Sequence, residues 1–228
     1  MRDDEVMSKL RGILLNGEIA PSARIPEREL CAQLGVSRTA IRDALKVLAA
    51  EGLVQLLPHR GARAAKLSAK DMQDLFEVCQ GLEAMAGALA CERVTDAECA
   101  DIRMTHEAMI SHYRNGDLVQ YYRLNRQIHR AIVNAARNPV LSELYGVVAA
   151  RIRRARHVVP MEPQRWAAAA KEHEFILDAL LRRDGAALAD ILRRHLRDKW
   201  EDVVRAGFAE TNEPPPAQDR HGLFGGNH

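Results

Sequence analysis

Residues 26–66 read PERELCAQLGVSRTAIRDALKVLAAEGLVQLLPHRGARAAK, and this stretch decides the fold of the N-terminal part of the chain. Pro26 suits the first position of a short helix that Gly35 closes, and Ser37 is a good N-cap for a second helix. A basic hairpin follows, with Gly61 free to take a positive φ in its turn. Two short helices and a basic hairpin in this order predict a winged helix-turn-helix, an architecture that reads DNA.

The segments next to this stretch extend the same domain. Apolar residues at helical spacing predict a first helix over residues 4–16. The hairpin, or wing, is expected to consist of strands over residues 53–57 and 62–67. We therefore expect a DNA-binding domain over residues 1–67.

Beyond this domain the sequence predicts helices alone, which makes the fold class mainly α. Capping boxes at Ser68-x-x-Asp71 and Thr95-x-x-Glu98 open the first two helices. Six helices are expected in all, over residues 68–93, 95–114, 117–136, 139–158, 163–183 and 184–207. Helices of this length form an all-α bundle, an effector-binding and dimerisation domain over residues 68–208. Residues 209–228, rich in Pro and Gly, are expected to form a disordered tail.

Composition and charge indicate an intracellular protein whose partner is negatively charged. Residues 1–66 carry 11 Lys and Arg against 8 Asp and Glu, a net charge of +3, whereas the remainder carries −1. The basic excess therefore lies where a phosphate backbone would need it. The four Cys form no C-x-x-C pair and read as reduced packing residues, and no signal peptide or membrane span is apparent. We expect a cytoplasmic protein with no membrane partner.

The helix that begins at Ser37 exposes the side chains suited to DNA. Arg38 and Arg42 lie one turn apart with Thr39 between them, so one face offers two forked donors to base edges or phosphates. Arg28, on the preceding helix, is expected to meet the DNA backbone from the side. The alternative is that these arginines only solvate a surface or pair with neighbouring carboxylates, among them Glu27.

The motif IPERELCAQLGVSRTAIRDALKVLAAEGLV, followed by a P-x-R-G-A wing, resembles the GntR family of bacterial transcription regulators. This resemblance covers residues 5–67. It implies DNA contacts at Arg28, Ser37, Arg38, Thr39, Arg42, His59, Arg60 and Gly61.

The helical remainder resembles the FCD effector domain of the FadR-like branch of that family. The matching motifs are Asn125-x-x-x-His129, His173 in KEHEFILDAL and His195 in RRHL. The resemblance implies a divalent metal ion held by these four residues, zinc ahead of nickel or manganese. It also implies a small carboxylate effector that completes the coordination sphere.

Two positions depart from the commoner pattern of that domain. Asn125 stands where many members have Asp, which removes a negative charge and weakens the expected affinity for a metal. Cys79 stands where many members have an Arg that helps to hold the ligand. The residue at position 125 therefore bears on whether the site holds a metal, and the residue at position 79 bears on which class of effector binds.

The run Arg151-Ile152-Arg153-Arg154-Ala155-Arg156 could hold an anionic effector or form a second nucleic-acid patch. A helix spreads these charges around its axis, which favours a solvated face with one inward arginine. Arg151 and Arg154 are the candidates for that inward, effector-binding position.

These patterns favour a ligand-responsive transcription regulator, a repressor that binds a palindromic operator as a homodimer, because one reading helix covers only a half-site. One alternative is a metal-dependent enzyme, although the sequence indicates no separate carboxylate placed as a general base beside the histidines. Another is an architectural DNA-binding protein with an inert bundle. We expect the protein not to be an enzyme.

Overall fold

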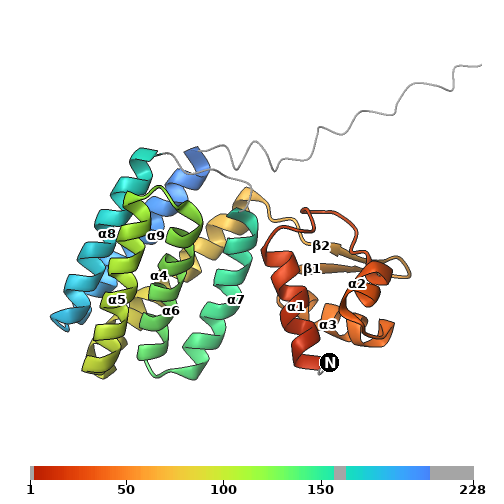
Figure 1. Cartoon of the computed structure of the whole chain (residues 1–228), viewed down its shortest axis with the longest axis horizontal. Coiled ribbons are helices and arrows are strands. Elements are labelled where there is room, and N and C mark those ends of the chain that lie inside the picture. Colours follow the sequence, from red (N-terminus) through yellow and green to blue (C-terminus); the bar gives the residue numbers. More distant parts are fainter. Residues whose placement is uncertain (1–2, 157–162, 206–228) are drawn as a thin grey trace, which may run out of the picture.

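The computed structural model describes residues 3–156 and 163–205 of the chain. A small head and a larger helical bundle lie side by side (Figure 1). The head consists of residues 3–64, and its elements are α1 (Asp3–Leu15), α2 (Glu27–Leu34), α3 (Arg38–Ala50), β1 (Val54–Leu57) and β2 (Gly61–Ala64). These elements confirm the winged helix-turn-helix.

Local chemistry explains the helices of the head. Gly35 ends α2 in the left-handed conformation, with φ 65°. The Ser37 hydroxyl accepts a hydrogen bond from the Ala40 amide at 3.2 Å and so caps α3. The apolar stripes of α1 and α3 then meet in one core with the strands; its fully buried side chains include Leu10, Leu14, Ile41, Leu45, Leu48 and Leu53.

The wing is an antiparallel pair in which Val54 lies opposite Ala64 and Leu57 lies opposite Gly61. Gly61 has φ 81°, as expected for its turn, and His59 also adopts a positive φ of 58°. The predicted strand over residues 62–67 is wrong at both ends, because β2 runs only from Gly61 to Ala64. The chain leaves the sheet after Ala64, and the buried Leu67 packs with the bundle instead.

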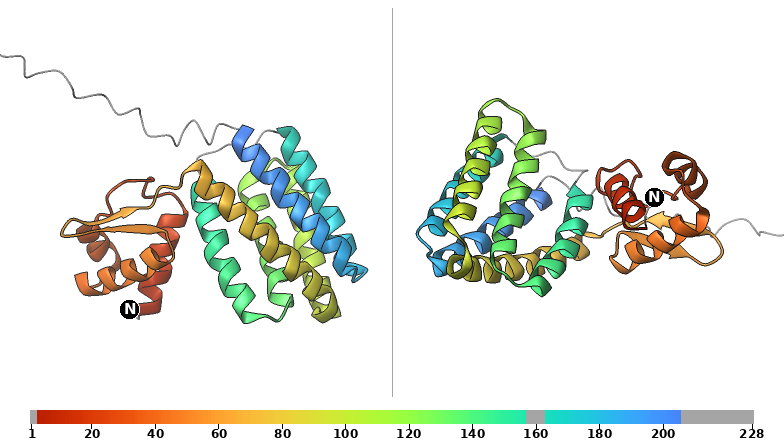
Figure 2. Two further views of the ribbon diagram at one scale, coloured as in Figure 1. Left: turned by 180° about the vertical axis from the view of Figure 1, so that it is seen from behind. Right: turned by 60° about the horizontal axis from the view of Figure 1, so that its bottom comes forward.

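The bundle consists of residues 69–205, which form helices alone within the described part of the chain. α4 packs along most of α9, α5 packs on α6, and α8 lies against α5 and α9 (Figure 2). The elements are α4 (Ala69–Arg93), α5 (Asp96–Arg114), α6 (Leu118–Ala135), α7 (Pro139–Arg156), α8 (Pro163–Leu181) and α9 (Gly185–Arg205). The mainly α fold class is confirmed, and both predicted capping boxes are present.

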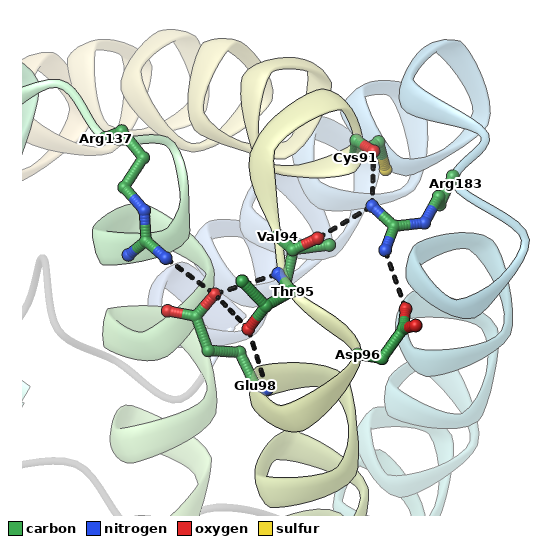
Figure 3. Close-up of polar contacts among 7 residues, drawn as sticks. All are labelled: Cys91, Val94, Thr95, Asp96, Glu98, Arg137 and Arg183. Carbon is green, nitrogen blue, oxygen red and sulfur yellow. Dashed lines mark hydrogen bonds and ion pairs between the residues drawn. The ribbon is translucent and has the colours of Figure 1, made fainter.

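Two arginines brace the corner between α4 and α5 (Figure 3). Arg183, after α8, donates to the Val94 carbonyl at 2.7 Å and to Asp96 at 2.9 Å. Arg137, after α6, donates at 2.8 Å to Glu98, which also receives the Thr95 amide of the capping box. Four helices are thereby tied together at one end of the bundle.

α7 is the bundle helix that packs against α1 of the head (Figures 1 and 2). Ala150 packs against the core of the head. The Arg151 guanidinium lies over Gly52, where an added Cβ would come within 3.0 Å of Nε. Ile152 shares an apolar cluster with Leu67 of the link between the wing and α4. The head therefore rests on one short section of α7.

Three predictions lie outside the described residues: the end of the helix predicted to reach residue 158, the end of the helix predicted to reach residue 207, and the tail over residues 209–228. Within the described ranges, no helix combines the length and the apolar character needed to cross a membrane.

Candidate metal centre and nucleic-acid interface

Three helices bring three buried histidines together inside the bundle. His129 comes from α6, His173 from α8 and His195 from α9. One ring nitrogen of each lies within 4.8 Å of those of the other two, and the ring centroids are 5.0–5.2 Å apart. The side chains are 4%, 0% and 2% exposed. Imidazole nitrogens gathered in this way suit a divalent ion of the zinc or nickel type.

Two carboxylates fix the orientation of two of these rings. His129 Nδ1 lies 2.6 Å from Glu83 Oε2, and His195 Nδ1 lies 2.5 Å from Glu172 Oε2. An ionised carboxylate only accepts hydrogen bonds, so Nδ1 is the donor in each pair, and in the neutral tautomer with this donor the lone pair lies on Nε2. His129 Nε2 has no hydrogen-bond partner among the residues that the structure describes. Ring orientation by an outer carboxylate is typical of a metal ligand.

Asn125 completes the group of four side chains singled out in the sequence. It is buried one turn before His129, and its amide contacts Nε2 of His173. A half-turn about χ2 exchanges the amide oxygen and nitrogen, so the same side chain can present Oδ1 to an ion. Burial, together with the neighbouring histidines, lowers the pKa of His173 well below its usual value. This favours the neutral imidazole that coordination requires.

Glu83 also contacts residues on two helices besides its own histidine partner. The Cys79 thiol donates to Oε1 at 3.9 Å. Burial raises the pKa of the Tyr145 hydroxyl well above its usual value, and the charge of Glu83, to which this hydroxyl is hydrogen-bonded, adds to the effect. Burial likewise raises the pKa of Cys79, so both groups remain protonated donors. Glu83 therefore links α4, α6 and α7.

The sequence did not indicate the two carboxylates at this centre. Glu83 is 3% exposed and lies in a helix interior, where no motif distinguishes it from a surface glutamate. Glu172 precedes His173, yet it reaches His195 on the next helix instead. Carboxylates do lie beside two of the histidines, but each accepts a hydrogen bond from a ring nitrogen.

The structure places the two candidate effector arginines on α7. The contact of Arg151 is with Gly52 of the head, and its Nε is buried with no hydrogen-bond partner in the described residues. Arg154 belongs to the last described turn of α7, and its side chain lies outside the described part. Their role in effector binding stays a prediction.

The exposed face of α3 presents the predicted DNA-reading residues. Arg38, Thr39 and Arg42 are all exposed, and Arg28 is exposed on α2. Arg42 Nε donates to Glu27 at 3.2 Å, as the alternative interpretation allowed, and its side chain is 65% exposed. An exposed ion pair contributes at most about 1 kcal/mol, so it competes weakly with a phosphate or a base.

The wing offers a second contact surface at its tip. His59 and Arg60 are exposed, and Gly61 lies against the Glu27 carboxylate. Arg24 donates to the Arg60 carbonyl at 3.0 Å and so supports the tip from the segment before α2. The sequence alone did not indicate Arg24, because its backbone pairs with Arg63 across a gap of many residues.

Comparison with known families agrees with both parts of the chain. The family of bacterial regulatory proteins named gntR matches residues 2–63, and the FCD domain matches residues 74–198. The two matches cover the head and most of the bundle. A winged DNA-reading head joined to an FCD bundle defines a class of transcription regulator.

Curated relatives extend over nearly the whole chain. The Nta operon transcriptional regulator of Aminobacter aminovorans is 30% identical over 81% of this chain and 86% of that protein. A probable D-xylose utilization operon transcriptional repressor of Paenarthrobacter nicotinovorans is 29% identical over 84% of this chain and 85% of its own length. The chain belongs to the GntR family of transcription regulators, which confirms the resemblance and decides against the enzyme alternative.

Solved structures share the fold. Escherichia coli McbR/YncC has a TM-score of 0.80 at 23% identity, over 89% of this chain and 97% of that one. A GntR regulator from Rhodococcus sp. RHA1 has a TM-score of 0.74 at 23% identity, over 90% of this chain and 98% of that one.

Proposed function

We propose that this regulator is a metal-dependent, ligand-responsive repressor that binds a palindromic operator as a homodimer in the cytoplasm. The observation that carries the proposal is the group of three buried histidines, two of them held by carboxylates, inside the FCD bundle of a GntR-family chain. The relative in Paenarthrobacter nicotinovorans, a probable transcriptional repressor, supports the repressor role.

His129, His173, His195 and the Asn125 amide oxygen would hold the divalent ion. When bound, such an ion supplies Lewis acidity and open coordination positions for a small carboxylate effector. The chain itself presents nitrogen lone pairs through the Glu83 and Glu172 contacts and keeps bulk water away by burial. An amide oxygen carries no charge, so weaker metal binding is expected than with a carboxylate at this position.

The proposed DNA contacts are spread over the head. Arg38, Thr39 and Arg42 would enter the major groove, whereas Arg28 would contact the backbone. Ser37 would contribute mainly by capping α3, because its hydroxyl already accepts the Ala40 amide. The wing tip would contact the adjacent DNA backbone through His59, Arg60 and Gly61. The proposed division into domains is at residues 67 and 68.

Metal analysis of untagged protein purified without a chelator tests the centre. We expect about one divalent ion per chain, and a loss of it when His129, His173 and His195 are all replaced by Ala. His112→Ala is the matched control, since His112 pairs with Asp117 at the end of α5, away from the cluster. Protein without stoichiometric metal, even after incubation with zinc, nickel or manganese salts, would contradict the metal centre.

Selection of binding sites from random DNA at fixed salt tests the proposed palindromic operator and homodimer. We expect an inverted repeat whose half-sites are spaced by about one helical turn, and a complex with two chains per site. A thermal-shift screen of small carboxylates, with and without metal, then identifies effectors. DNA control that persists unchanged in the triple His variant would favour the architectural alternative with an inert bundle.

A further inference from the structure

Glu83 connects the histidine cluster with α7, the helix on which the head rests. Its carboxylate lies 2.6 Å from His129 Nδ1 and also accepts the Tyr145 hydroxyl. Both Glu83 and His129 are buried, so few alternative partners are available to either. Any reorientation of the His129 ring therefore changes the geometry of the Tyr145 hydrogen bond on α7.

Tyr145 stands close to the section of α7 that contacts the head. Arg151 follows it by six residues, which is a rise of about 9 Å along one uninterrupted helix. The Tyr145 ring packs against two apolar clusters of the bundle, so movement of the ring requires movement of the helix.

Three consecutive residues carry the contacts at the far end of this section. Ala150 packs against the core of the head, Arg151 covers Gly52, and Ile152 belongs to the same apolar cluster as Leu67. Gly52 lies at the end of α3, the helix that presents Arg38 and Arg42. A shift of α7 would therefore displace the C-terminal end of α3 and the link between the domains.

We propose that Glu83 and Tyr145 are positioning residues that couple the state of the histidine cluster to the orientation of the head through α7. This inference rests on the proposed metal centre. With His129 Nε2 engaged, Nδ1 stays fixed on Glu83, and the carboxylate holds the Tyr145 hydroxyl in one place. With Nε2 not engaged, the His129 ring has other orientations, and the populations of α7 positions relative to the head change.

Hydrogen exchange of the full-length protein, measured with zinc and with a chelator, tests the coupling. In the unaltered protein we expect zinc to change exchange in peptides that cover residues 50–56 and 146–153. In Tyr145→Phe we expect zinc affinity within about threefold of the unaltered value and a response at residues 50–56 reduced by about half or more. Tyr113→Phe is the matched control, because Tyr113 packs on Trp166 in another part of the bundle.

Gly52→Ala tests the same coupling from the side of the head. The added Cβ would meet Arg151 Nε at 3.0 Å at a position with φ 73°, so the arginine side chain must shift by a few tenths of an ångström and the backbone is strained, while the histidine cluster is untouched. We expect unchanged zinc affinity and a reduced response at residues 50–56.

The outcomes separate the coupling from the metal centre. Zinc binding with no change at residues 50–56 in the unaltered protein overturns the coupling alone. A full response in Tyr145→Phe or in Gly52→Ala overturns it as well. Absence of zinc binding overturns the metal centre and the coupling together.

Discussion

Replacing Glu83 by Gln removes the charge that holds His129 while keeping the shape of the side chain. The carboxylate is 3% exposed and lies 2.6 Å from Nδ1, so solvent does not screen this contact. Glutamine can still offer one oxygen, but its NH₂ group then faces Tyr145 or Cys79, which are themselves donors. We therefore expect zinc affinity to fall about 10- to 100-fold, which is about 1.4–2.7 kcal/mol.

Competition of the full-length protein against a chromogenic zinc chelator measures this loss directly. Glu77→Gln is the matched control on the same helix, since Glu77 is exposed and accepts only from Gln73 in the contacts described. The control should retain the original affinity within about twofold. Equal zinc affinity in Glu83→Gln and the unaltered protein would refute the idea that this carboxylate prepares His129 for coordination.

Three further predictions concern the head and the bundle. Arg42→Ala should weaken binding to the selected operator by about 1–3 kcal/mol in a titration at fixed salt, and an unchanged affinity would remove Arg42 from the base contacts. Ser68→Ala should lower the free energy of unfolding by about 1 kcal/mol in urea, because it removes the N-cap of α4; no change would show that the cap is dispensable. Hydrogen bonds from Ser68 lower the pKa of Asp71, so its contribution is complete above the unfolded pKa of about 3.9 and is lost as the pH falls through the lower folded value. The stability difference between the unaltered protein and Asp71→Asn should therefore shrink below about pH 4, and a difference that stays constant down to about pH 2 would contradict this origin.

The helices were predictable because their ends depend on neighbouring residues. Ser37, Ser68 and Thr95 each cap the helix that directly follows, and the structure shows each of these hydrogen bonds. The end of β2 was not predictable in this way. The predicted strand extended to Leu67, but Leu67 is buried in an apolar cluster of the bundle that includes Ile152 on α7, far along the chain.

The candidate metal centre likewise has residues that the sequence indicated and one that it did not. Asn125 and His129 share a helix face at a spacing of four residues, and the family motifs indicated His173 and His195. Their convergence within 4.8 Å agrees with that expectation, although the role of each residue in holding a metal stays a prediction. The role of Glu83 could not be predicted from the sequence. Its contacts with His129 and Tyr145 exist only because α6 and α7 pack against α4, and its sequence neighbours do not indicate them.

The contact of Arg151 with Gly52 also bears on whether a regulator of this kind can be recombined from the head of one protein and the bundle of another. In a recombinant that joins this bundle to another head, a residue with a Cβ at position 52 would displace the Arg151 side chain, since even the Cβ of alanine would lie 3.0 Å from its Nε. Compatibility between swapped halves would then depend in part on one backbone position at the contact between the head and the bundle.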